Sequence, residues 1–154
     1  MVYGPKIIEH FQNPRCAGKI PDADGVATIA EGCGDVFRFY VKVRGNRLEK
    51  VRYEVKGCPV AIACCSMTAV LAEGKTLVEA MQITNQVVEK ALGGLPPEKK
   101  HCSNLAADAL YEAIQDYLYK RALEGKTSPA RSSGDDWRNL YLQRETPGSK
   151  GNWR

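Results

Sequence analysis

Two neighbouring segments of the chain alternate between apolar and polar residues, and this alternation limits the fold more than any other feature. Residues 36–43 place phenylalanine or valine at every second position, with arginine, tyrosine and lysine between them. Residues 50–55 repeat the alternation after a Gly45-Asn46 turn signal. A period of two is typical of strands with one buried face, and a short turn between two such strands predicts a hairpin. A weaker strand candidate at residues 25–30 would supply the third strand that a small stable sheet needs.

Past residue 57 the apolar residues repeat at helical spacing. Residues 61–72 are rich in small and apolar side chains, with a proline shortly before them and Gly74 just beyond them, which predicts a largely buried helix. Residues 76–79 have the form of a capping box that opens a short helix, and residues 85–92 predict another. Strands therefore precede helices, and the fold class is α+β, a three-stranded antiparallel sheet packed with a C-terminal set of helices.

Two more helices are expected at the ends of this pattern. Residues 106–118 carry apolar side chains at helical spacing, and Ser103 is the expected N-cap of that long final helix. Leu95-Pro96-Pro97 predicts an extended, rigid connection before it. Residues 5–11 predict a short N-terminal helix, which we expect to serve as a flap more than as a core element.

Length and composition predict one domain with a tail. At 154 residues and 44% hydrophobic content the chain can bury one core, and residues 1–125 are expected to form it. Residues 126–154 are rich in serine, glycine, proline and charge, which predicts a polar, flexible tail. This tail holds six basic and three acidic side chains, so residues 1–125 hold sixteen basic and fifteen acidic side chains. A nearly neutral body without a basic stripe does not favour nucleic-acid binding.

The cellular compartment decides how the six cysteines are interpreted. No apolar run reaches the roughly 18 residues of a membrane span, and the first residues lack the basic and apolar regions of a secretory signal. We therefore expect a cytoplasmic protein with no membrane partner. In a reducing compartment, cysteines favour metal or sulfur chemistry over a disulfide framework.

Three cysteines occupy loops at the ends of predicted elements. Cys33 precedes the first strong strand, Cys58 follows the hairpin and Cys102 precedes the last helix. If the helices pack as one layer on the sheet, these loops can converge. Cys58 and Cys102 would then lie near helix N-termini, where the positive end of the helix dipole lowers a thiol pKa and favours the thiolate. The spacing alone is unlike that of zinc fingers or ferredoxins, and buried packing of each thiol is the alternative.

Five local motifs, in order along the chain, resemble those of the U-type iron-sulfur cluster assembly scaffold family, represented by IscU and the N-terminal domain of NifU. The resemblance covers residues 8–123, about three quarters of the chain. It implies the α+β fold of the wider SufE/NifU superfamily. The motifs are His10 to Arg15, Cys33-Gly34-Asp35, Gly57-Cys58 leading into Ala61-Ile62-Ala63, Leu92 to Pro97, and His101 to Ala106.

The resemblance implies a role for each site residue. Cys33, Cys58 and Cys102 would be the cluster ligands and sulfur acceptors, Asp35 a fourth ligand or a labilising neighbour, and His101 an alternate ligand. This set agrees with ligand chemistry, because three soft thiolates hold iron and sulfide while a hard carboxylate completes the shell weakly enough to be displaced. A permanent electron carrier would more naturally have four thiolates.

The resemblance also implies the partners and the cargo. A cysteine desulfurase would deliver persulfide sulfur. Reduction in the presence of iron would then build a transient [2Fe-2S] cluster, which would pass to apo iron-sulfur proteins. Such a protein is a scaffold and sulfur acceptor, not an enzyme, and it can be a monomer or a homo-oligomer that shares a cluster. The family's chaperone motif usually has valine where this chain has Glu98, which does not favour docking to an Hsp70-type chaperone.

Four other side chains depart from the pattern or are ambiguous. Cys64 and Cys65 replace small residues and serines, and we expect both to pack in the core, although Cys65 could lie below the site on the face of Cys58. Cys16 stands where the family more often has asparagine, and we expect an exposed, incidental thiol. His10 is expected to be a surface or packing residue and not a ligand.

Three rival functions stay open on the sequence. A zinc-binding sulfur-transfer protein of the SufU branch would use the same residues, but that branch typically has an insertion between the second and third cysteines, and residues 72–101 look too compact for it. Zinc could also occupy the site in purified protein. A zinc hydrolase would need a placed general base, for which His10 and His101 are the chain's two histidines. A zinc-stabilised interaction module would unfold without its metal.

Overall fold

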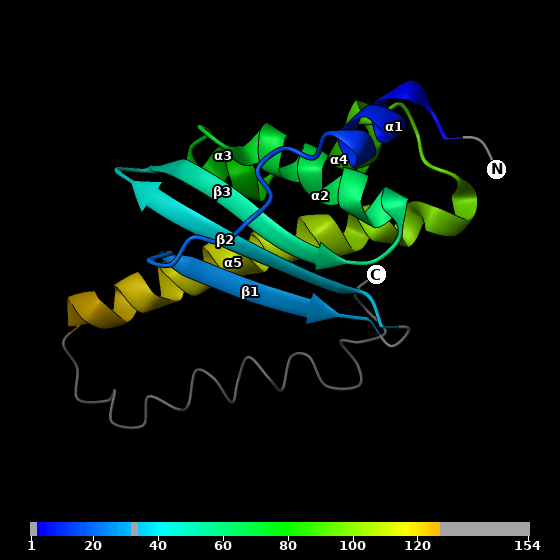
Figure 1. Ribbon diagram of the computed structural model, residues 1–154. Helices are drawn as coiled ribbons and strands as arrows, with labels where there is room; N and C mark the ends of the chain where they lie inside the picture. The colour runs from blue at the N-terminus through cyan, green and yellow to red at the C-terminus, as the bar shows by residue number, and fades with distance from the viewer. Residues whose placement is uncertain (1–2, 32–33, 127–154) are drawn as a thin grey trace.

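The computed structural model describes residues 3–31 and 34–126, and within them a three-stranded antiparallel sheet is covered by helices (Figure 1). Strands β1 (Gly25–Ala30), β2 (Val36–Arg44) and β3 (Arg47–Lys56) follow one another in space as in sequence. Phe39 pairs with Ala27 on one side and with Tyr53 on the other. The predicted sheet and its strand order along the chain are confirmed. The tail beyond residue 126 lies outside the described residues.

The alternation in the sequence corresponds to the two faces of the sheet. Phe37, Phe39 and Val41 of β2 are fully buried, and Val51 and Tyr53 of β3 lie beside them with at most 1% exposed. The side chains between them occupy the opposite face, which is more open to solvent, although Tyr40 on that face is only 8% exposed. A register shift at Lys42/Val43 interrupts the ladder near the hairpin turn. The apolar face is therefore available for the helices.

Two long helices cover that face. Helix α2 (Pro59–Ala72) packs against β3, and α5 (Lys100–Lys126) packs against β1 and β2 and runs behind the sheet in Figure 1. The predicted burial of α2 is confirmed, since ten of its fourteen residues are buried. The two helices also contact each other. Their N-termini consequently lie at the same end of the sheet as the end of β3.

Short helices fill the remaining sides. Helix α1 (Pro5–Gln12) packs on α2, while α3 (Leu77–Met81) and α4 (Asn85–Ala91) connect α2 to α5. The capping box that opens α3 is confirmed, because the Thr76 and Glu79 side chains each bond the other residue's backbone N–H. Within the described ranges, no helix is long and apolar enough to cross a membrane.

Three local expectations were wrong. Helix α5 begins at Lys100, so Ser103 lies inside its first turn and donates a hydrogen bond to the Lys100 carbonyl instead of capping it. Pro97 does not continue an extended segment but opens a 3-10 turn, η1 (Pro97–Lys99), that leads directly into α5. Helix α1 is more than a flap, because Ile7 is 1% exposed and belongs to the core.

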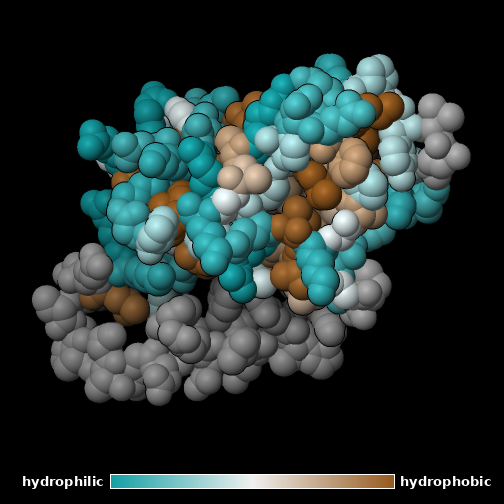
Figure 2. Space-filling view, in the orientation of Figure 1, coloured by the Kyte–Doolittle hydropathy of each residue, from teal (hydrophilic) through white to brown (hydrophobic). Residues whose placement is uncertain are grey.

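The surface in Figure 2 mixes hydrophilic and apolar groups, and the apolar ones lie mostly toward the α1 and α2 side of this view. Ile8 and Phe11 of α1 are each 40% exposed, and Val70 of α2 is 42% exposed. The N-terminal helix thus has a buried side against α2 and an apolar side open to solvent.

Candidate functional site

The thiols of Cys58 and Cys102 meet where β3 ends and helices α2 and α5 begin. Their sulfur atoms are 3.9 Å apart. Cys58 is half-buried and is the N-cap residue of α2, while Cys102 is fully buried in the first turn of α5. We expected Cys102 to lie in a loop before the last helix. This expectation is wrong, because Cys102 already lies inside α5.

Local sequence explains how Cys58 is held. Its backbone is extended, with φ −78° and ψ 171°, and Pro59 takes the first helical position, where a missing N–H costs nothing. The Cys58 carbonyl accepts the hydrogen bond of Ile62 N–H at 3.1 Å, which begins the helix. A thiol at this position lies close to backbone N–H groups that have no partner within the helix.

Asp35 approaches Cys58 from the start of β2. Its backbone carbonyl accepts a hydrogen bond from Glu31 N–H at 2.8 Å, and Gly34, at φ +107°, bonds back to the Glu31 carbonyl at 2.9 Å. A Cβ atom on Gly57 would be 3.3 Å from the Asp35 carboxyl carbon. The glycine before Cys58 therefore leaves the space into which the Asp35 carboxyl group fits.

His101 contacts the Cys102 thiol. Its Nε2 atom is 3.8 Å from the Cys102 sulfur, and its side chain is exposed. Cys33 lies outside the described residues, next in sequence to Gly34. Among the described residues 3–31 and 34–126, no group of three or more His, Cys, Asp or Glu side chains is already close enough together to hold a metal ion.

The donor chemistry nevertheless suits a metal or an iron-sulfur cargo. Two thiolates bonded to one tetrahedral ion at about 2.3 Å are about 3.8 Å apart, close to the separation of the Cys58 and Cys102 sulfurs. The His101 imidazole lies 3.8 Å from the Cys102 sulfur, and the Asp35 carboxyl group lies next to Gly57, the residue before Cys58. Any further metal ligand would have to move toward the thiol pair or come from outside the described residues.

Burial controls the protonation of Cys102. The loss of solvent raises the pKa of this thiol above its ordinary value, and the neighbouring Cys58 and Asp35 raise it further, while Lys99 lowers it. The expectation that the helix N-terminus makes the Cys102 pKa low is therefore wrong for the metal-free protein. The Cys102 thiol must lose this proton before its sulfur can bind a cation.

The charge of the two thiols acts on the ammonium group of Lys99. Its pKa is raised, first by the Cys58 thiol and then by Cys102, against the lowering effect of its own partial burial. Lys99 stands three residues before Cys102, a spacing that puts two side chains on one face of a helical turn. That spacing was visible in the sequence, but its meaning depended on where the last helix starts.

The remaining cysteines lie apart from the pair. Cys64 and Cys65 are both fully buried, and burial raises the pKa of each thiol well above its ordinary value, so the expected core packing is confirmed. Cys16 is not an exposed, incidental thiol: it is half-buried, at φ +66°, with its sulfur 3.9 Å from Glu73 Oε1. His10 is 5% exposed and its Nδ1 is 2.7 Å from Ser66 Oγ, as expected for a packing residue.

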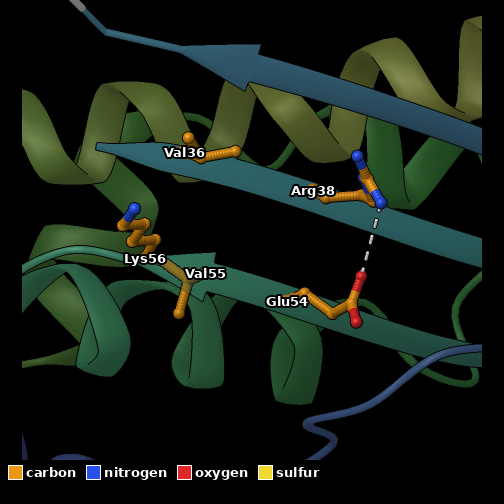
Figure 3. A pocket seen from close by; sticks show the side chains of 5 residues that line it. All are labelled: Val36, Arg38, Glu54, Val55 and Lys56. Atoms are coloured by element: carbon orange, nitrogen blue, oxygen red, sulfur yellow. Dashed lines mark ion pairs between the residues drawn. The ribbon is translucent and has the colours of Figure 1, made fainter. Parts of the chain in front are cut away.

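A hollow of about 260 Å³ lies on the sheet beside the site, between β2 and β3 (Figure 3). Val36 and Val55 form its apolar part, and an ion pair of 3.6 Å joins Arg38 to Glu54 on one side. The fifth lining residue, Lys56, immediately precedes Gly57. None of the described candidate ligands lines this hollow.

Comparison with known proteins places the chain in a family. The family model described as NifU-like N terminal domain matches residues 2–124. Two Archaeoglobus fulgidus proteins, both named iron-sulfur cluster assembly scaffold protein IscU, are 53% identical over 120 residues, which is 77% of this chain and 78% of theirs. The protein of that name from Azotobacter vinelandii is 40% identical over 128 residues, 80% of this chain and 99% of its own.

Solved structures agree on the fold. A NifU-like protein (N-terminal) from Brucella abortus superposes with a TM-score of 0.61 at 23% identity over 76% of this chain and 94% of its own. The SufU protein of Fervidobacterium islandicum gives the same TM-score and sequence identity over 73% of this chain and 96% of its own. At this identity the structures support the α+β architecture alone. With the family match across most of its length and these sequence relatives, the chain belongs to the family of NifU-like N-terminal domains.

Proposed function

We propose that this protein is an iron-sulfur cluster assembly scaffold whose activity resides in residues 1–125. The observation that carries the proposal is the pair of thiols from Cys58 and Cys102, which are 3.9 Å apart, with His101 Nε2 3.8 Å from the Cys102 sulfur. The names of the sequence relatives support the same function. Iron and sulfide are the cargo of this site, not a resident cofactor.

The proposed ligands differ in their softness toward metal ions, and each kind has a different role. Cys33, Cys58 and Cys102 supply thiolates for iron and sulfur. Asp35 supplies a carboxylate that binds iron and is displaced easily, and His101 is an alternate ligand from the exposed side. A mixed donor set of this kind holds a labile [2Fe-2S] cluster that apo iron-sulfur proteins can remove.

Sulfur would enter by transfer from the persulfide of a cysteine desulfurase. A thiolate of the scaffold attacks the terminal sulfur of the donor, a new S–S bond forms, and the donor cysteine leaves as a thiolate. Of the two candidate thiols that the structure describes, Cys58 is the more suitable acceptor, because it is half-buried at a helix start whereas Cys102 is fully buried. The scaffold has no turnover of its own in this sequence of steps.

Anaerobic reconstitution tests the proposal. The protein is incubated with iron, cysteine and a cysteine desulfurase, and the visible absorption is followed before and after addition of an apo-ferredoxin. Wild type should develop a cluster that transfers, and Cys33→Ser, Cys58→Ser and Cys102→Ser should each abolish it. Cys16→Ser is the matched control, because that thiol contacts Glu73 at another part of the fold.

A zinc-binding sulfur-transfer protein is the second candidate. The Cys58 to Cys102 sulfur distance suits two thiolates on a single tetrahedral ion, which favours a mononuclear site as much as a cluster. Stoichiometric zinc in the purified protein, acceptance of persulfide sulfur and no transferable cluster would replace the scaffold function with this one.

A further inference from the structure

The sulfur atoms of Cys58 and Cys102 are close enough to bond to each other and not only to a shared ion. They lie 3.9 Å apart, and a disulfide bond is about 2.05 Å long, so an approach of about 2 Å would join them. A change of side-chain rotamer moves a cysteine sulfur by about this distance. The pair can therefore close as a disulfide when one of the two sulfurs carries a leaving group.

The two thiols differ in their access to solvent. Cys58 is the N-cap residue of α2 and is half-buried, whereas Cys102 is 0% exposed in the first turn of α5. A sulfur donor or a reagent in solution therefore reacts with Cys58 first. Cys102 is shielded from the donor but lies beside the modified sulfur. A reactive thiol with a second thiol at its side is the arrangement of an attacking and a resolving cysteine.

Cys16 provides a contrast within the same fold. It is also half-buried, but its sulfur lies 3.9 Å from Glu73 Oε1, a carboxylate oxygen that carries no thiol chemistry. A group attached to Cys16 would meet a negative charge instead of a second sulfur. Partial burial alone thus does not make a thiol pair, and Cys16 serves as the matched control below.

We propose that Cys102 is the resolving thiol of this site, which attacks the inner sulfur of a Cys58 persulfide and releases the outer sulfur as sulfide. This inference rests on the proposed function for the persulfide. A bond forms between the Cys58 and Cys102 sulfurs, and the bond from Cys58 to the outer sulfur breaks. The outer sulfur leaves with the bonding electron pair as hydrosulfide and takes the Cys102 proton. The products are a Cys58–Cys102 disulfide and hydrogen sulfide.

The electrons of this step come from the protein. The outer sulfur is reduced by two electrons, and the Cys102 thiol supplies them as it is oxidised to the disulfide. Hydrosulfide is a weaker base than a cysteine thiolate, so it is the better leaving group from Cys58. The fixed position of Cys102 raises its effective concentration at Cys58, which offsets the slower loss of a proton from a buried thiol. A dithiol reductant must then reopen the disulfide before both sulfurs can bind iron.

An aromatic disulfide reagent tests the thiol pair without any persulfide. One equivalent of 4,4′-dithiodipyridine is added to EDTA-treated protein, and the released thiopyridone is followed by its absorption. Cys58 should take up one pyridylthio group, and Cys102 should then displace it, so that two equivalents of thiopyridone leave. Mass mapping should find the tryptic peptides 57–75 and 101–120 joined by a disulfide between Cys58 and Cys102.

Removal of the resolving thiol should stop the second displacement. Cys102→Ser should keep the pyridylthio group on Cys58 and release the second thiopyridone at least about tenfold more slowly than wild type. Cys102→Ala repeats the test if the serine variant does not fold. Cys16→Ser should form the Cys58–Cys102 disulfide as wild type does, because that thiol contacts Glu73.

Sulfide release tests the step itself. Cys58 is loaded with cysteine persulfide, the donor is removed by gel filtration, and sulfide is trapped with monobromobimane in the absence of added reductant. Wild type should release sulfide in the same amount as the Cys58–Cys102 disulfide that appears. Cys102→Ser should retain the persulfide on Cys58.

The outcomes distinguish this step from the proposed function. Equal sulfide release from folded Cys102→Ser or Cys102→Ala, a persulfide moved to Cys102, or a disulfide between Cys58 and Cys33 would overturn the resolving role, even if clusters assemble normally. Sulfide release coupled to the Cys58–Cys102 disulfide supports the role even if wild type builds no cluster with iron and a desulfurase. That last result would contradict the proposed function instead.

Discussion

Cys58 and Cys102 are chemically the same side chain in two different environments. Cys58 caps α2 and is half-buried, so reagents can reach it. Cys102 is fully buried, and burial next to Cys58 and Asp35 keeps its proton on the sulfur by raising its pKa. In the proposed function, Cys58 is the thiol that accepts sulfur, and Cys102 is a ligand that binds after it loses its proton.

The raised pKa of Cys102 predicts a pH dependence of stability. The folded metal-free protein holds this proton more tightly than the unfolded chain, whose thiol titrates near the ordinary value of 9.0. The stabilisation is therefore complete below that pH and is lost as pH rises through and above it, by up to about 1.4 kcal/mol per pH unit for one group. Urea unfolding between pH 7 and 10.5 should show the free energy of unfolding falling above pH 9.

Replacing the thiol isolates its contribution. Cys64 and Cys65 also have raised pKa values and add to the slope in wild type. The free energy of unfolding of Cys102→Ala should therefore fall less steeply above pH 9 than that of wild type. Between pH 7 and 8 it should be nearly constant for both proteins. Parallel curves for the two proteins across the alkaline range would mean that Cys102 titrates normally in the folded protein.

At the level of elements, one glycine sets how closely β1 packs on α5. A Cβ atom on Gly25 would lie 2.2 Å from the Ala113 carbonyl oxygen and 3.0 Å from the Tyr117 Cβ. The contact is reinforced nearby, where the Val26 N–H donates to Asp116 Oδ2 at 3.0 Å. No side chain can enter this gap unless the strand and helix separate.

Gly25→Ala should therefore destabilise the protein by about 1–3 kcal/mol, the usual cost of overpacking. Thermal and urea unfolding of the metal-free protein measure the change. Gly4→Ala is the control, because an added Cβ meets nothing within 4 Å there, and its cost should stay below about 1 kcal/mol. Equal effects of the two substitutions would show that β1 can move away from α5 freely.

The sequence predicted the elements whose signals are local. The sheet follows from alternation, α2 from its composition and flanking residues, and α3 from its capping box. The sequence prediction failed where tertiary contacts decide where a helix begins or how it packs. The start of α5 depends on the Pro97 turn and not on the cap that Ser103 could offer, and α1 is part of the core because Ile7 packs against α2.

At the scale of the whole molecule, the candidate site is a consequence of layer packing. The end of β3 and the starts of β2, α2 and α5 meet at one end of the sheet, which brings Asp35, Cys58 and Cys102 together. The sequence indicated this convergence through loop positions and motifs. The burial of Cys102 could not be predicted, because it depends on where α5 begins.

The same packing predicts that the protein folds without bound metal. The core joins the sheet, α1, α2 and α5 through side chains with almost no exposed surface, and apolar side chains make up most of it. Protein stripped with EDTA should therefore keep its circular dichroism spectrum and unfold cooperatively, unlike a module whose fold is made by zinc.

Adding zinc to the stripped protein should raise its Tm, because an ion that binds only the folded state stabilises it by about 2.7 kcal/mol at a hundredfold excess over Kd. Cys58→Ser/Cys102→Ser should lose most of this shift, whereas Cys16→Ser should keep it. The shift should also grow between pH 6 and 8, since zinc must displace the Cys102 proton. If EDTA unfolds the wild-type protein, the metal is structural, and the thiol pair serves the fold instead of a labile cargo.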